Sequence, residues 1–276
     1  QHENCTKHFF RGEAVQIKNP LSQDMAFVRN SILPGLLMAA SYNEKRQEKG
    51  FKLFEKGTVH NKAKKSPTGS NEKFHLGLLW YGDVNIHWRA FEERDIFRYK
   101  GEVSQILNSI GIVNISFKLS QESGLESSMK IYSGKMQVGN MGIPKPEILK
   151  AYDLIHAPFL CDFSIYIMSN LWKSQKTEYK VPVPFPSMTR DIALQISSNV
   201  AASDLMSTIM KQGGSALNHV SLFDVYQLDG VNNANKSLAF SLKFQSETAT
   251  LTDSEVDKDV EVILKSLKEI HGAIQR

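Results

Sequence analysis

The sequence predicts an α+β chain of two domains, an antiparallel-sheet module followed by a βαββαβ unit. Strand-like and helix-like segments separated by hairpin turns fill residues 1–172. A polar and proline-containing stretch at 173–184 interrupts this pattern and favours an extended connection. Residues 185–276 then read strand, helix, strand, strand, helix, strand. We therefore expect domains at 1–172 and 185–276, joined by a linker at 173–184.

The composition bounds the class of protein. A chain of 276 residues with 41% hydrophobic and 22% charged residues can bury sizeable cores. Its apolar runs are too short to cross a bilayer, so we expect no membrane association. Cys5 and Cys161 lack the spacing of a disulfide framework, which favours a reducing, cytoplasmic location. Because the chain opens at Gln1 rather than Met, we expect it to be a piece of a longer polypeptide.

Charge is distributed unequally along the chain. Residues 1–179 contain 24 Lys and Arg against 18 Asp and Glu, whereas residues 180–276 contain 9 against 11. A domain with a small negative net charge does not attract phosphates as a whole. Any nucleic-acid contact in the second domain must therefore depend on a local group of cations.

Hydrophobic periodicity gives the elements of the first module. The expected helices are a stretch from Met25 to Ala40, broken or restarted at Pro34, another from Asp95 to Ser109, and a short one after Pro144. The expected strands are 51–59, 74–81, 129–132, 136–138 and 159–168. Residues 61–73 between the first two strands should form a hairpin loop with solvated lysines.

The second domain has clearer signals. We expect strands at Asp191–Ser197, Val220–Leu228, Ser237–Gln245 and Ala273–Gln275, and a helix at Ser203–Gln212. The final helix begins with Thr252 and Glu255 in capping-box spacing and ends before Gly272. This order is that of a ferredoxin-like domain.

Strand alternation divides the sheet of this domain into two faces. The side chains that should face the helices are Ile192, Leu194, Ile196, Leu238, Phe240, Leu242 and Phe244. Those that should lie on the open face are Asp191, Ala193, Gln195, Ser241, Lys243 and Gln245. In the strand from Val220 both parities are apolar, so the sequence does not decide whether Phe223 or Tyr226 reaches the open face.

Catalytic and metal-binding patterns are missing from the sequence. The eight histidines show no metal-ligand spacing, and neither cysteine nor any serine stands in a nucleophile motif. Residues 230–237 approach the phosphate-loop pattern, but Asn235 replaces its second glycine and the segment links two expected strands. We therefore assign no catalytic residue and no metal ligand.

Motifs in both domains carry a family resemblance. In the first they are Asn19-Pro20-Leu21-Ser22, Val28-Arg29-x-Ser31-Ile32-Leu33-Pro34-Gly35-Leu36-Leu37, Leu53-Phe54-Glu55-x-Gly57 and Tyr99-Lys100-Gly101-Glu102-Val103. In the second they are Phe185-Pro186-Ser187-x-x-Arg190-Asp191-Ile192-Ala193, Leu222-Phe223-Asp224-Val225-Tyr226, Lys236-Ser237-Leu238-Ala239-Phe240 and Leu251-Thr252-Asp253-x-Glu255-Val256. In order and spacing the chain resembles the C-terminal region of the β subunit of bacterial-type phenylalanyl-tRNA synthetase.

The resemblance implies a catalytically silent class II synthetase-like module followed by a ferredoxin-fold anticodon-binding domain. It also implies a catalytic α subunit as partner in a heterotetramer of two α and two β subunits, with tRNA(Phe) as the RNA ligand. ATP and Mg²⁺ would act in the holoenzyme, and this fragment itself would hold no cofactor. The residues agree, because class II chemistry uses arginines on ATP phosphates, and none occurs in 51–55 or between Arg98 and Arg190.

The resemblance and the charge pattern together give candidate site residues. Candidates for tRNA contact, on a face expected to be locally positive, are Arg190, Lys236, Ser237, Lys243 and Arg276, with Phe223 and Tyr226 as possible stacking residues. Candidates for the α-subunit interface are Ile32, Leu33, Leu36 and Leu37, whose alternative is the internal core. Two other functions remain open: an active single-chain class II synthetase, and a stand-alone RNA-binding or regulatory module with a ferredoxin-like ligand domain.

Overall fold

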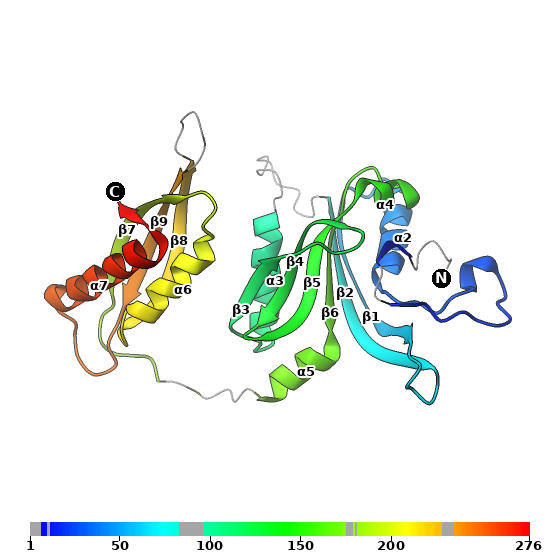
Figure 1. Ribbon diagram of the computed structural model, residues 1–276, viewed down its shortest axis with the longest axis horizontal. Helices are drawn as coiled ribbons and strands as arrows, with labels where there is room; N and C mark the ends of the chain where they lie inside the picture. Colours follow the sequence, from blue (N-terminus) through cyan, green and yellow to red (C-terminus); the bar gives the residue numbers. More distant parts are fainter. Residues whose placement is uncertain (1–6, 10–11, 83–95, 175–178, 180, 228–234) are drawn as a thin grey trace. The chain divides into compact units, whose positions relative to one another are not determined.

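The computed structural model describes residues 7–9, 12–82, 96–174, 179, 181–227 and 235–276. The chain divides into two compact units, Gln1–Glu178 and Tyr179–Arg276 (Figure 1). The division falls inside the predicted linker at 173–184. Within the described ranges, no helix has both the length and the apolar character needed to span a bilayer.

The first unit is built on a six-stranded antiparallel sheet (Figure 1). In spatial order its strands are β1 (Gly50–Lys62), β2 (Ser70–Gly82), β6 (Phe159–Ser164), β5 (Met136–Pro144), β4 (Leu125–Ser133) and β3 (Ile115–Leu119). Neighbouring residues in β2 and β6 belong to different apolar cores, because alternate side chains point to opposite faces and both faces are covered. The predicted α+β class with antiparallel pairing is confirmed.

Helices cover both faces of this sheet. On one face lie α2 (Leu33–Glu44) and α4 (Pro146–Ala151), and on the other lie α3 (Ile96–Ser109) and α5 (Ile165–Ser174). Leu37, Leu79 and Leu160 form part of the first core, and Val103, Met141 and Phe163 form part of the second. A three-layer unit results, in which the sheet is buried between helices.

The first helix is shorter than the sequence suggested. Only a 3-10 turn forms at Gln23–Met25, and α2 starts at Leu33 with Pro34 in its first turn. Proline fits there because the first turn of a helix needs no N–H donor from it. Pro34 therefore starts the helix, and the apolar residues before it pack from a non-helical segment.

Other bounds expected for the first unit also differ from those observed, and the strands expected at 129–132 and 136–138 extend over 125–133 and 136–144. The apolar run Phe159–Met168 is not one strand, because β6 ends at Ser164 and α5 begins at Ile165. A short apolar run does not distinguish a buried strand from a helix. The strand Ile115–Leu119 was missed, and the loop expected at 61–73 is a turn of residues 63–69 between longer strands.

Gly77 shows how closely α2 approaches the sheet. A Cβ atom at this position would lie 2.6 Å from Ile32 Cγ2 and 2.8 Å from Leu36 Cδ1. Such distances are shorter than van der Waals contact, so a larger residue would push the helix away. The absence of a side chain at Gly77 sets the packing distance between α2 and β2.

The second unit is a four-stranded antiparallel sheet with two helices. Its strands, in spatial order, are β10 (Ile274–Gln275), β7 (Met188–Ser197), β9 (Asn235–Phe244) and β8 (Leu217–Gln227). Its helices are α6 (Ala202–Gln212) and α7 (Asp253–His271). All predicted elements of this unit form, including the edge strand after Gly272. Of the predicted loop at 230–237, residues 230–234 lie outside the described residues and 235–237 belong to β9.

Helix α7 has the ends that its sequence predicts. Glu255 Oε2 accepts hydrogen bonds from the Thr252 backbone N–H at 2.9 Å and from Thr252 Oγ1 at 2.8 Å. Gly272 follows the helix with a φ of 68°, in the left-handed region that glycine adopts without strain. These two ends place Ile274 in register with Gln195 of β7.

Glu44, at the end of α2, connects this helix to the segment before β6. Its carboxylate accepts hydrogen bonds from the Tyr81 hydroxyl and from the backbone N–H groups of Ile155 and His156, the latter two at 3.0 and 3.1 Å. Burial acts to raise the pKa of Glu44, but these hydrogen bonds outweigh it and hold the pKa below its ordinary value. Burial and the hydrogen bond to Glu44 raise the pKa of Tyr81.

We expect Glu44→Gln to lower the free energy of unfolding at neutral pH by about 1–3 kcal/mol, because an amide replaces a charged acceptor. The stabilisation from Glu44 is present above its unfolded pKa of about 4.3 and is lost as the pH falls through the lower folded pKa. Urea unfolding from pH 7 to 3 should therefore show a difference between the wild type and the variant that shrinks in acid. Glu48→Gln, at an exposed position nearby, is the control. A difference that stays constant with pH would contradict the assignment.

Limited proteolysis should cut the turn between β1 and β2 first. Lys64 and Lys65 are exposed and lie in a turn between the two strands, outside any helix or strand. We expect trypsin to cleave after one of these lysines before it cleaves after Lys211 of α6, because helical backbone must unfold to be cut. Mass spectrometry of early fragments would check this, and a first cut after Lys211 would refute the arrangement.

Candidate nucleic-acid interface

The sheet of the second unit has one face covered by helices and one face without them (Figure 1). Ile192, Leu194 and Ile196 of β7 are at most 3% exposed and pack with α6 and α7. From β9, Leu238, Phe240, Leu242 and Phe244 join the same core. The alternation predicted from the sequence is confirmed for both central strands. The remaining side chains of these strands form what we call the open face.

Strand register gives the arrangement of the open face. Ala193, Ala239 and Asp224 form one row across the three long strands, and Asp191, Ser241 and Ser221 form the next. On one side of these rows lie Gln195, Ser237 and Tyr226, with Ile274 of β10 beside Gln195. On the other side lie Thr189, Lys243 and His219. The centre of the open face is thus built mainly of small side chains and is bordered by larger ones.

The register also decides between the two aromatic residues of β8. Tyr226 is paired with Ser237, which belongs to the open face, so the Tyr226 ring lies on that face and is 51% exposed. Phe223 lies at an irregularity of the pairing between Leu222 and Asp224 and is 59% exposed. A bulge shifts the parity of the strand at this point. The sequence alone gave no sign of this shift, which is why it left the face of β8 undecided.

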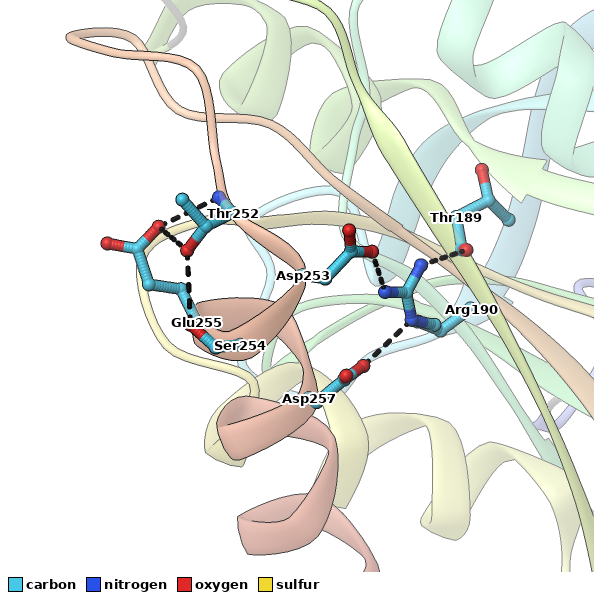
Figure 2. Close-up of polar contacts among 7 residues, drawn as sticks. All are labelled: Thr189, Arg190, Thr252, Asp253, Ser254, Glu255 and Asp257. Atoms are coloured by element: carbon cyan, nitrogen blue, oxygen red, sulfur yellow. Dashed lines mark hydrogen bonds and ion pairs between the residues drawn. The ribbon is translucent and has the colours of Figure 1, made fainter.

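Arg190 does not lie on the open face. Its parity is that of Ile192, and its guanidinium contacts the first turns of α7 (Figure 2). Nη2 lies 2.5 Å from Asp253 Oδ1, and Nε lies 2.9 Å from Asp257 Oδ1. Hydrogen bonds to Asp253 and then to Asp257 raise the pKa of Arg190. Arg190 thus links β7 to α7, and its contact with tRNA stays a prediction.

Lys236 is also on the side of the helices. It is paired with Ile196 and Gln227, and its Nζ donates a hydrogen bond to the Ser198 carbonyl at 3.1 Å. The register of β9 thus keeps Lys236 off the open face, and its contact with tRNA stays a prediction. Ser237, the next residue, is on the open face but only 8% exposed.

Lys243 and Arg276 remain as basic candidates. Lys243 is exposed on the open face between Thr189 and His219. The Arg276 backbone N–H donates to the Ala193 carbonyl at 3.0 Å, which extends the pairing of the edge strand. Asp191 and Asp224 are exposed on the same face, so among the described residues the acidic side chains balance the basic ones. The expectation of a locally positive face is not met.

The four candidates for a subunit interface are core residues in this structure. Ile32, Leu33, Leu36 and Leu37 are at most 3% exposed and pack against β1 and β2. The core alternative considered above therefore holds for them, because α2 uses this stripe to cover the sheet. The exposed apolar side chains of α2 are Met38 and Tyr42.

The first unit has, in its described part, a cavity of about 740 Å³ whose polar lining includes Glu44, Tyr81 and His156. Its most enclosed polar pair is His75 and Asp162, whose Nδ1 and Oδ1 atoms lie 2.7 Å apart at 6% and 2% exposure. This pair connects β2 to β6 inside the unit, where a substrate has no access. Within the ranges that the structure describes, no group of three His, Cys, Asp or Glu residues is placed to hold a metal ion.

Comparison with known proteins gives each unit a family. Residues 2–165 match the family described as phenylalanyl tRNA synthetase beta chain CLM domain. Residues 184–276 match the ferredoxin-fold anticodon binding domain. The two descriptions define the class, a protein of the aminoacyl-tRNA synthetases that carries an anticodon-binding module.

Curated relatives match the chain across both units. The phenylalanine–tRNA ligase beta subunit of Geobacillus kaustophilus is 32% identical over 96% of this chain and 33% of its own length. That of Pasteurella multocida is 31% identical over 96% of this chain and 34% of its own length. A solved pyrrolysyl-tRNA synthetase from Desulfitobacterium hafniense is 13% identical over 63% of this chain and 60% of its own, with a TM-score of 0.48. The chain belongs to the phenylalanyl-tRNA synthetase beta chain family, and it spans about a third of the length of the curated relatives it matches.

We expect Arg190→Gln to lower the thermal stability of the second unit, with little effect on the first. The loss arises from ion pairs at the surface, so high salt should reduce it, because the screening length falls to about 3 Å at 1 M salt. Thermal unfolding of both proteins at low and high salt measures this difference, with Arg276→Gln as the control for a lost charge. A difference between wild type and Arg190→Gln that does not shrink in salt would contradict the ion-pair role.

Proposed function

We propose that the second unit binds the anticodon stem-loop of tRNA(Phe) on its open face. The proposal is based on a sheet face that no described helix of this unit covers, in a unit that matches an anticodon-binding family. On this face an exposed tyrosine lies beside small alanine and serine side chains. Unpaired bases of an RNA loop can lie flat against these small side chains and stack on an aromatic ring. Serine and glutamine side chains on the same face can form hydrogen bonds with base edges.

The mode of binding follows from the charges of the open face. Asp191 and Asp224 balance the charges of Lys243 and Arg276, so phosphate attraction supplies little of the binding energy at this surface. Stacking on Tyr226, with Phe223 close by in sequence at the bulge, supplies more. The binding of an isolated stem-loop should therefore depend only weakly on salt concentration.

We propose further that the first unit is a scaffold for the catalytic α subunit, in a holoenzyme that ligates phenylalanine to tRNA(Phe). The chain alone carries out no catalysis in this proposal, and ATP and Mg²⁺ act on the α subunit of a heterotetramer of two α and two β subunits in the cytoplasm. Family membership supports the partnership, and the exposed Met38 and Tyr42 of α2 supply apolar contact surface.

The other functions fit the molecule less well. An active single-chain synthetase would need arginines for ATP phosphates, and Arg29, in the first unit, instead contacts Glu55 and donates to the Thr58 carbonyl at 2.9 Å. A stand-alone regulatory module would not account for the match to the beta subunits, which runs through both units of this chain and covers about a third of each relative.

We expect Tyr226→Ala to weaken binding of the tRNA(Phe) anticodon stem-loop by about 1–3 kcal/mol, which is the contribution of one base stacked on an aromatic side chain. Fluorescence anisotropy with a labelled stem-loop measures the affinity. Tyr226→Phe keeps the ring and is the matched control. The slope of affinity against salt should be similar in all three proteins.

Equal affinities of wild type and Tyr226→Ala would place the stem-loop away from the open face. Circular dichroism and thermal unfolding establish that the variants are folded. Because Tyr226 is half exposed and belongs to none of the described cores, its truncation should leave stability nearly unchanged.

A further inference from the structure

The β1–β2 hairpin of the first unit extends beyond the six-stranded sheet (Figure 1). The two strands are paired from Gly50 with Gly82 to Lys62 with Ser70, but β2 contacts β6 only along His75–Trp80. Residues 58–62 and 70–74, with the turn 63–69, therefore form a two-stranded ribbon, and none of the described strands lies beside it as a third. We refer to residues 58–74 as the ribbon.

The ribbon is held in place by the chain segment before α2. The His60 N–H donates to the Arg29 carbonyl at 2.8 Å, and the Lys62 N–H donates to the Glu13 carbonyl at 2.8 Å. Three further backbone hydrogen bonds close the turn between Ala63 and Gly69. An isolated two-stranded ribbon is marginal in water, so these contacts provide rigidity that the two strands alone would lack. A rigid arm loses little conformational entropy when it binds a partner.

The ribbon carries an excess of positive charge. It contains Lys62, Lys64, Lys65 and Lys73 against one acidic residue, Glu72. Lys62 Nζ forms an ion pair with Glu13 Oε1 at 2.5 Å, and Glu72 lies 3.8 Å from His60 Nδ1. Within the part of the chain that the structure describes, Lys64, Lys65 and Lys73 are exposed and form no ion pair. Three cations are thus available to an anionic ligand.

Two exposed aromatic side chains lie on one face of the β1–β2 hairpin. Phe74, opposite Thr58 in the ribbon, is 43% exposed. Phe54, on the same face of β1 by strand parity, is 74% exposed, and Lys56 stands between Phe54 and Thr58 on that face. The hairpin thus has exposed rings and Lys56 on one face, Lys73 on the other and Lys64 and Lys65 at its turn. Rings and cations together fit a nucleic acid, whose bases stack and whose phosphates attract cations.

The distribution of charge between the units favours the same ligand. The second unit has 9 basic against 11 acidic residues in 180–276, and its open face is balanced in charge. Long-range attraction of a polyanion therefore has to come from the first unit. The ribbon, with four lysines against one acid in 17 residues, is a compact source of that attraction.

We propose that the ribbon is a second RNA contact, which binds the phosphate backbone of tRNA outside the anticodon stem-loop through Lys64, Lys65 and Lys73. This inference rests on the proposed function, because it takes tRNA as the ligand of the chain. It assigns the salt-dependent part of the affinity to the ribbon and the salt-independent part to the open face.

The test compares Lys64→Gln/Lys65→Gln with Lys265→Gln/Lys268→Gln in the 276-residue chain. The control removes the same charge from exposed positions on α7. Filter binding of a full-length tRNA(Phe) transcript and of its anticodon stem-loop is measured from low to high salt. We expect the ribbon variant to bind the full transcript roughly tenfold more weakly than the control, with a salt slope smaller by about 1–2, and to bind the stem-loop as the control does.

Equal affinity and equal salt slope of the two variants for the full transcript would overturn the proposal. If the ribbon variant then also failed to co-purify with a co-expressed α subunit, the ribbon would be a protein contact. A stem-loop that binds neither wild type nor control would disprove the proposed function of the open face. A difference between the ribbon variant and the control that is seen only with the full transcript would still support RNA binding by the ribbon. Failure of the ribbon proposal can therefore be told from failure of the open-face proposal. Thermal unfolding of both variants checks that they fold, which we expect because all four lysines are exposed.

Discussion

Helices α6 and α7 cover one face of the four-stranded sheet, and this unequal coverage is the constraint on which the second unit depends. Alternate side chains of a strand point to opposite faces, so burying Ile192 and Phe240 obliges their neighbours to lie on the open face. A shift of register by one residue would exchange the two sets. The capping box of α7 and its link to Arg190 hold the covering helix in place, which keeps the other face available for a ligand.

The first unit follows a different rule. Helices lie on both sides of its sheet, so the central strands offer no free face, and polar groups such as His75 and Asp162 are enclosed with them. What remains accessible includes the outside of the helices, the end of the β1–β2 hairpin and a cavity of about 740 Å³ beside Glu44, Tyr81 and His156. A scaffold with a basic arm is consistent with this geometry.

The two units therefore differ in the surface that they offer to a ligand: the first offers positive charge, and the second offers small side chains and an exposed ring. The ribbon provides cations on a rigid arm, and the open face provides small side chains and an exposed ring with little net charge. Phosphate contacts are independent of sequence and sensitive to salt, while stacking and hydrogen bonds to bases can discriminate between loops. Such a division would let attraction and recognition be altered independently by substitution.

The sequence by itself determined the order of elements in the second unit, the division into two units, both ends of α7 and the faces of β7 and β9, because these follow from local periodicity, composition and capping. Parity already puts Arg190 and Lys236 on the helix side, but the sequence did not determine their partners, since Asp257 and Ser198 come from other elements. Nor did it place Tyr226, whose face depends on a bulge against β9. The sequence alone allows the apolar residues from Ile32 to Leu37 to belong either to an interface or to the core. Their packing against β2 shows that they belong to the core. Side-chain partners far apart in the chain are set by packing, which local patterns do not record.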